Sequence, residues 1–405
     1  MGQTLPADSA IGFTLKFAEA LHRYGTPAHR LEDAMTVLSN ILHIKGQFFV
    51  TPTAIFASFE TSGVNETRML RVDSSELDLG KLSALDSLID ELAQSSITIS
   101  HAARRVDEIL GERAPYGAFL TTACYALTCA CAARFFGGGL HEVSAALLIG
   151  LLIGLGELAV PFSRRLAALF APLAATMAAL LATAITTYWP PASAYVITLG
   201  SLIVMVPGLT LTVAMKELAT RHLASGTARL AGAFVLFATM GFGVAFGTKV
   251  GAFFFGNPAF IEPVMLPAWT ELIALGIAPI ALAVNMRAER RFIPAIIAGC
   301  VLAFATARFG ANLLGTDLGV FAGAMILGVG SNIFSRVARR PSAIVLIPGM
   351  IMLVPGGIGF KGLSALLRGD VVSGVETIFL VAMIAIALVT GLLVANTLVP
   401  PRKAL

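Results

Sequence analysis

Two proline–glycine pairs interrupt apolar runs of this chain, and their chemistry is unusual for such a place. Residues 204–215 read VMVPGLTLTVAM, and residues 352–363 read MLVPGGIGFKGL. Proline removes a backbone donor and clashes with the carbonyl four residues earlier, while glycine frees the next dihedral angles, so each pair predicts a broken helix. A break offers backbone carbonyls to a cation and the amino end of a half-helix to an anion, which suits a small zwitterion.

Hydroxyl and amide side chains near the breaks extend this set of candidate groups. Two threonines follow the first break, whereas the second break adds only glycine. Asn332 can hydrogen-bond a ligand from inside an apolar run, although such an Asn, like Asn285, more commonly links helices. A simple packing kink is the alternative explanation for each break. The candidate substrate-binding residues are Pro207, Gly208, Thr210, Thr212, Asn332, Pro355, Gly356 and Gly357.

Two carboxylates inside apolar runs are candidates for carrying protons. Glu157 lies in the run IGLLIGLGELAVPF, where an ionised carboxyl is costly and proton exchange is therefore expected. Its alternative is to reach the headgroup region beside Arg164 or Arg165. Glu271 is the second candidate, and exposure at the outer membrane interface explains it more simply.

The composition places these residues in a membrane. Of 405 residues, 57% are hydrophobic and 13% are charged, and the mean hydropathy is +0.84. This balance excludes an ordinary soluble protein and predicts a polytopic membrane protein. Lys and Arg number 10 against 15 Asp and Glu in residues 1–113, but 18 against 9 in residues 114–405. An acidic head therefore precedes a basic, apolar body.

Residues 1–112 predict a small cytoplasmic α+β domain. Gly25 ends the first helix, and Thr26 and Pro27 follow as the expected cap and first residue of the second. Alternating apolar residues predict two strands joined by a turn-rich segment. The expected elements are helices at 11–24, 27–42, 81–92 and 100–110, and strands at 47–60 and 67–73.

The head does not carry the pattern of an enzyme. Its chemistry-bearing residues come without a nucleophile elbow, a phosphate loop or metal-ligand spacing; they are His29, Arg30, Glu32, Asp33 and His101. A regulatory or assembly domain is expected, and its net negative charge argues against nucleic acid. The four cysteines lie in apolar runs and are interpreted as packing residues. No catalytic residue, metal or cofactor is predicted.

The body divides into ten predicted membrane spans of about 20 apolar residues, the length that crosses about 30 Å of hydrocarbon. With a cytoplasmic head, 13 of the body's 18 basic residues fall on the cytoplasmic side, so both termini are predicted there. Lys216 and Glu217, at the cytoplasmic end of span four, predict a solvated ion pair, with a gate as the alternative. The spans are 115–133, 143–162, two between 165 and 216, 230–248, 265–286, 292–307, 318–335, 341–360 and 377–401.

A weak internal repeat relates the two breaks. Pro207 and Pro355 are 148 residues apart, and Gly208 meets Gly356 at the same offset. Because each copy would hold five spans, the second must be inverted, and inverted repeats with interrupted helices are typical of secondary transporters. The predicted fold is an α-helical polytopic membrane protein. Its parts are the α+β domain 1–112 and two inverted five-span repeats, 113–255 and 256–405.

Five stretches, taken in order, resemble the threonine/serine exporter family of bacterial inner-membrane carriers. They are GTPAHRLEDAM, TPTAIFASF, ARRVDEIL, SLIVMVPGLTLTVAMKEL and SNIFSRVARRPSAIVLIPGMIMLVPG. The resemblance covers nearly the whole chain. It implies a cytoplasmic amino-terminal domain, ten spans in two halves, and export of threonine and serine driven by the proton gradient. In split relatives the cargo is a dicarboxylate, so a small dicarboxylate such as succinate stays open. The resemblance assigns no site residue.

The resulting expectation is a secondary active transporter that works by alternating access in a bacterial inner membrane. Its partners would be a small amino acid, protons and the lipid bilayer, without nucleic acid, and a homo-oligomer is left open. From other classes, a membrane-embedded hydrolase would need a carboxylate dyad or a nucleophile with its base. A passive channel would conduct without proton coupling. No cationic residue falls in mid-span, which favours a zwitterion over a dicarboxylate.

Overall fold

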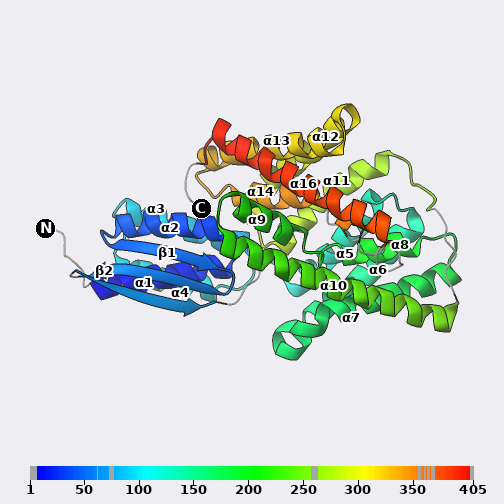
Figure 1. The fold of residues 1–405 in the computed structure, drawn as a ribbon, viewed down its shortest axis with the longest axis horizontal. Coiled ribbons are helices and arrows are strands. Elements are labelled where there is room, and N and C mark those ends of the chain that lie inside the picture. Colours follow the sequence, from blue (N-terminus) through cyan, green and yellow to red (C-terminus); the bar gives the residue numbers. More distant parts are fainter. Residues whose placement is uncertain are drawn as a thin grey trace.

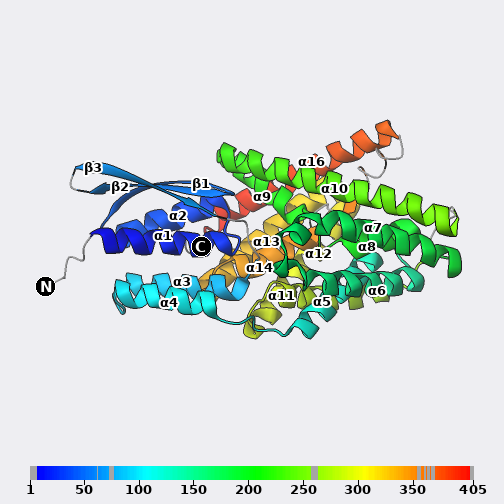
Figure 2. The same ribbon diagram turned by 90° about the horizontal axis from the view of Figure 1, so that it is seen from below.

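The molecule consists of a mixed head and an all-helical body arranged along its long axis (Figure 1). The structure is a computed structural model. It describes residues 7–61, 63–72, 77–256, 263–353, 357–359, 362, 365 and 370–401. The head comprises residues 7–111 and lies at one end, and the body extends away from it in both views (Figure 2).

The head is built in three layers. A sheet lies outermost, one pair of helices covers it, and a second pair lies beneath the first (Figure 2). The sheet is antiparallel, with the strand order β1-β2-β3. Its elements are α1 (Ala7–Arg23), α2 (Ala28–Ile41), β1 (Lys45–Thr51), β2 (Ala54–Thr61), β3 (Val64–Arg71), α3 (Leu79–Ala93) and α4 (Ile99–Gly111).

The prediction of one strand over 47–60 is wrong, because a tight turn divides it into β1 and β2. Thr51 lies opposite Ala54 across this hairpin. The backbone N–H of Ala54 donates to Oγ1 of Thr51 at 3.0 Å, which fixes the turn. Hairpins of this length usually carry Gly or Asn. Here a threonine hydroxyl makes the bond instead, so the usual sequence signal is missing.

The start of α2 also differs from the prediction. Pro27 occupies the cap position rather than the first helical position, and its side chain makes no capping bond. The N–H of Ala28 donates instead to Oε1 of Glu217, a residue of the body, at 2.9 Å. A carboxylate at the amino end of a helix also interacts favourably with the helix dipole. The cap predicted for Thr26 therefore comes from 189 residues further along the chain.

The regular elements of the body are all helices among its described residues. Seven of these helices are long and apolar enough to cross a membrane. They are α5 (Ala118–Phe135), α6 (Leu140–Glu157), α7 (Arg164–Tyr188), α10 (Leu223–Phe255), α12 (Ile293–Leu314), α13 (Thr316–Ala338) and α16 (Val371–Leu398). Shorter helices are α8 (Ala194–Leu202), α9 (Gly208–Ala219), α11 (Trp269–Asn285) and α14 (Ala343–Leu353), and η1 (Val160–Phe162) and η2 (Arg290–Phe292) are single 3₁₀ turns. The polytopic membrane class is confirmed, while ten spans and inverted repeats stay predictions.

Glycines let the long helices approach one another closely. A Cβ added at Gly247 of α10 would lie 2.2 Å from the carbonyl oxygen of Thr176 in α7, and Gly243 lies against α7 in the same way. Gly319 and Gly323 of α13 make the same approach to α12. Their four-residue spacing is the small-residue pattern of membrane helix pairs. These glycines therefore serve packing rather than ligand binding.

Apolar and backbone contacts join the head to α11, α12 and α14. One buried cluster combines leucines of α3 with Leu282, Met286 and Phe292. At the first turn of α3, the N–H of Leu79 donates to the Met286 carbonyl at 2.9 Å, and that of Gly80 donates to the Arg287 carbonyl at 3.2 Å. The amino end of one helix thus meets the carboxyl end of another, and each satisfies the other's unpaired groups.

Gly247→Ala tests the close approach of α7 and α10. The added methyl group has no room, so we expect a loss of stability of about 1–3 kcal/mol and a lower melting temperature of the detergent-solubilised protein. Gly232→Ala in α10 is the matched control because a Cβ there meets nothing within 4 Å. The control should melt at or above the wild-type temperature, since alanine favours helix. Wild-type melting of Gly247→Ala would contradict the packing role.

Candidate functional site

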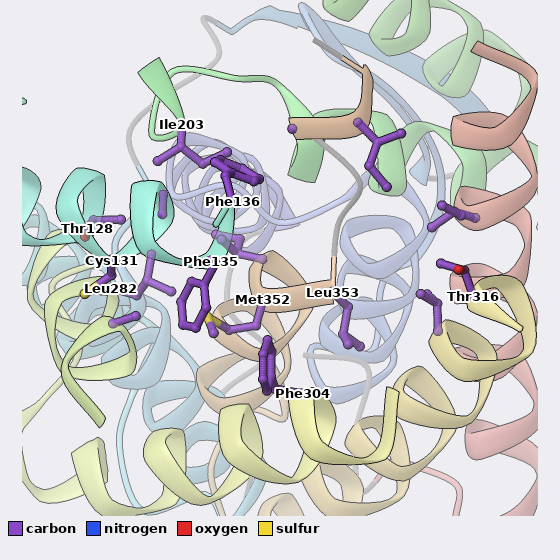
Figure 3. A pocket seen from close by; sticks show the side chains of 17 residues that line it. Thr128, Cys131, Phe135, Phe136, Ile203, Leu282, Phe304, Thr316, Met352 and Leu353 are labelled. Atoms are coloured by element: carbon purple, nitrogen blue, oxygen red, sulfur yellow. The ribbon is translucent and has the colours of Figure 1, made fainter. Parts of the chain in front are cut away.

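A cavity of about 230 Å³ lies in the body beside both proline–glycine stretches (Figure 3). Ile203, the first residue after α8, lines it, as do Leu353 at the end of α14 and Gly357 four residues later. Ligand pockets generally measure about 300–1,000 Å³, so this space suits a small molecule. The other lining residues are Thr128, Cys131, Ala132, Phe135, Phe136, Ala278, Leu282, Phe304, Thr316, Val320, Ile351, Met352, Ile358 and Ile384.

The first predicted break is confirmed. Helix α8 ends at Leu202 and α9 begins at Gly208, so the helix is interrupted between them. Pro207 has φ −76° and ψ 43°, which is not helical, and Pro207 and Gly208 are both buried. These two residues form the break without lining the described cavity. Their neighbour Ile203 reaches the cavity wall.

The second predicted break falls largely outside the described residues and stays a prediction. Pro355 and Gly356 lie outside the described residues, whereas Gly357 lines the cavity. A Cβ at Gly357 would lie 2.4 Å from the ring of Phe136, which comes from the end of α5. Glycine therefore lets the aromatic ring at the end of α5 lie directly on the backbone beside the second Pro–Gly stretch.

The two threonines after the first break do not line the described cavity. The Thr212 hydroxyl is buried and donates to the carbonyl of Gly208 at 3.1 Å, within its own helix. Thr210 is half-buried. A helical threonine commonly bonds back to the preceding turn, which occupies its donor. Direct substrate contact by either residue stays a prediction.

Asn332 links two helices in this structure. Its amide nitrogen donates to Oδ1 of Asn396 at 2.9 Å and to the carbonyl of Val399 at 2.7 Å, joining α13 to the end of α16. The cavity residue Val320 lies 12 residues earlier on α13, or about 18 Å at 1.5 Å per residue. This geometry favours the helix-linking interpretation over substrate binding.

Neither predicted proton carrier borders the cavity. Glu157 is the last residue of α6, and the protein leaves its side chain exposed. Glu271 lies in the first turn of α11 and forms an ion pair with Arg308 of α12. Glu271 thus lies at a helix end, as its position in the sequence indicates. The proton-carrying role of both residues stays a prediction.

The cavity has a polar group that the sequence alone did not single out as a ligand-binding group. Thr128 of α5 lines it, and the amide of Asn285 donates to the Thr128 Oγ1 at 3.3 Å. The Thr128 hydroxyl donates in turn to the Cys124 carbonyl at 2.9 Å. Oδ1 of Asn285 is buried without a hydrogen-bond partner among the described residues. The sequence held one signal for a role of α5 in the interior, because α5 is the least apolar of the seven long helices. In the structure it is also the most buried of them.

The described part of the cavity wall is neutral. None of its described residues is Asp, Glu, Lys, Arg or His, and its side-chain hydroxyls come from Thr128 and Thr316. Aromatic rings form part of the remaining wall, with the ring centres of Phe135 and Phe304 5.3 Å apart (Figure 3). Within the described ranges, no three His, Cys, Asp or Glu side chains gather where they could hold a metal.

Comparisons with known proteins give the chain a family. A family model described as "Putative threonine/serine exporter" matches residues 12–251, and one described as "Threonine/Serine exporter, ThrE" matches residues 271–398. Pheromone-regulated membrane protein 10 of Debaryomyces hansenii is 25% identical over 372 residues, which are 88% of this chain and 36% of the relative. The protein of that name in Eremothecium gossypii is 26% identical over 362 residues, 86% and 48% respectively.

These relatives are longer proteins, and this chain spans about a third to a half of their length. No solved structure matches it. The first family match ends inside α10 and the second begins inside α11. The boundary between the two matches therefore falls near the middle of the body's sequence. The chain is thus a multi-pass membrane protein, and it belongs to the threonine/serine exporter family.

Proposed function

We propose that this chain is a secondary carrier that exports threonine and serine by alternating access, driven by the proton gradient. The single observation that carries the proposal is the small cavity, neutral in its described wall, that lies beside the first break and beside the second Pro–Gly stretch. Broken helices at a central cavity are the usual place for substrate in secondary transporters. The charge distribution supports a cytoplasmic head and cytoplasmic termini, and the resemblance supports a bacterial inner membrane.

The wall of the cavity favours a hydroxylated amino acid over a dicarboxylate. Two negative charges would call for cationic side chains, and the described wall has none. A zwitterion can be held by backbone groups at the interrupted helices. The donor of Thr128 is held by the Cys124 carbonyl, but its oxygen can accept a hydrogen bond from the hydroxyl of threonine or serine, as can that of Thr316. The phenylalanine rings then cover the apolar atoms of the substrate.

Purified protein in liposomes tests the substrate and the energy source together. We expect counterflow of threonine and serine, little counterflow of succinate or valine, and net export that responds to an imposed pH gradient. Succinate as the preferred substrate would select the dicarboxylate alternative. Flux that persists without response to the gradient would select a passive channel. Hydrolysis of an amino-acid amide or ester would point to an enzyme.

Thr128→Val tests recognition of the substrate hydroxyl. We expect the KM for threonine to rise on the order of tenfold, because one lost hydrogen bond contributes roughly 1.4 kcal/mol. Thr128→Ser keeps the hydroxyl and should retain wild-type preference. Thr239→Val is the matched control, since Thr239 is exposed on α10. An unchanged ratio of threonine to valine transport in Thr128→Val would exclude the contact.

Glu157→Gln separates proton coupling from substrate movement. If Glu157 carries the proton, the variant should retain threonine counterflow and lose export driven by a pH gradient. Counterflow exchanges substrate without net proton movement, so a coupling residue is not required for it. Glu271→Gln is the comparison, because Glu271 already pairs with Arg308. Gradient-driven export at the wild-type rate would remove Glu157 as the carrier.

A further inference from the structure

A buried carboxylate lies where the head meets α9 and α10. Glu217 is 0% exposed, although the sequence predicted a solvated pair with Lys216. Its Oε1 accepts from the N–H of Ala28 at 2.9 Å, and its Oε2 accepts from the hydroxyl of Ser225 at 2.8 Å. Nε of Arg229 lies 3.2 and 3.1 Å from the two oxygens. One side chain thus joins α2 of the head to α9 and α10.

A second set of bonds reinforces this junction. Nε2 of His222, in the short turn between α9 and α10, lies 3.1 Å from Oε2 of Glu32 on α2. Oε1 of Glu32 accepts from the N–H of Val50 in β1 at 2.8 Å. His29 packs its ring 5.9 Å from that of His222, and burial lowers the pKa of His29 to about 2, so its ring is neutral near pH 7. We call the contacts of Glu217 and Glu32 with these partners the clasp.

The head contacts the two halves of the body differently. Its apolar core continues into α11, α12 and α14 but includes no residue of α5 to α10 within the described chain. Contact with the first half includes the polar clasp and the approach of β1 to α10. Water can replace hydrogen bonds at little net cost, whereas exposing an apolar cluster costs about 25 cal/mol per Å². The clasp is therefore the junction that separates more easily.

Two sets of contacts connect the head to the cavity. Ile351 and Met352 of α14 line the cavity and also pack against the head's apolar core. On the other side, α9 runs from the first break at Gly208 to the clasp, a helix of 12 residues. Leu209 at its start packs in the cluster that contains Leu353. The head is thus connected to the elements beside both Pro–Gly stretches, to α14 through apolar contacts and to α9 through Glu217.

We propose that the contacts of the clasp break and re-form during transport and so act as a gate. Glu217 and Arg229 are positioning residues that hold the half-helix α9 against the head. The head stays fixed to α11, α12 and α14 while the clasp opens and closes during the transport cycle. This inference rests on the proposed function for its role in transport, but the unequal attachment of the head can be tested without any substrate.

Cysteine labelling tests the unequal attachment. Ala28→Cys places a thiol at the clasp and keeps the backbone N–H that Glu217 accepts. Ala288→Cys places a thiol in the apolar contact between the head and α11, α12 and α14. Both alanines are 0% exposed. The four native cysteines are buried and set the background. Adding Glu217→Gln should speed maleimide labelling at position 28 on the order of tenfold and leave position 288 unchanged. Equal acceleration at both positions, or at neither, would overturn the proposal.

Transport kinetics test the positioning role. Glu217→Gln should lower the turnover of threonine on the order of tenfold and leave its KM within about twofold, because the cavity wall is untouched. Glu217→Asp keeps the charge and should recover part of the turnover. Threonine added to the otherwise wild-type Ala28→Cys protein should change its labelling rate. Wild-type turnover in Glu217→Gln, or labelling that ignores threonine, would overturn the gate.

The two proposals can fail separately. Absence of threonine transport by the wild-type protein would remove the proposed function, while the labelling difference between positions 28 and 288 would still be measurable. Conversely, normal threonine transport with equal labelling at both positions would retain the carrier and remove the clasp as its gate.

Discussion

Backbone groups inside a bilayer have no water to bind, and this constraint organises the body. A helix can be interrupted there only where protein or a cavity covers the freed groups. At the end of the first interruption the cover is protein, because Val206, Pro207 and Gly208 are buried. Beside the second Pro–Gly stretch, a Cβ at Gly357 would meet the ring of Phe136. The cavity lies beside both places, and its described wall consists mostly of apolar side chains.

The same demand for paired polar groups explains how the head is attached. Proline cannot cap α2 with its side chain, so a buried carboxylate supplies the missing acceptor for Ala28. An ionised carboxyl is tolerated in such a place only when its oxygens are fully bonded, and Glu217 has donors on both. Because α2 has no side-chain cap of its own, its start is held by a specific contact with Glu217, a distant part of the chain. Loss of either partner would leave a buried group unsatisfied.

The sequence predicted those features that depend on local pattern. Apolar length predicted the membrane helices, and the Pro207–Gly208 pair predicted the interruption that the structure shows. It failed where distant residues meet. Nothing near Glu217 indicates that an N–H from residue 28 will cover it, and nothing near Thr128 indicates that Asn285 will bond to it. From the sequence, Thr212 appeared available to a substrate. Its hydroxyl instead bonds within its own helix, which composition does not reveal.

The neutral cavity limits how protons could drive export. A proton and a substrate cannot compete for one carboxylate in a wall whose described residues include none. The buried or paired carboxylates instead connect helices: Glu142 accepts from the N–H groups of Gly139 and Ser193, and Glu271 pairs with Arg308. If export is proton-driven, coupling must act through the equilibrium between conformations. A group that binds a proton more tightly in one conformation favours that conformation by 1.4 kcal/mol for each tenfold difference in affinity. Carboxylates that join two elements are suited to this, because protonation weakens a contact that only one of the conformations makes.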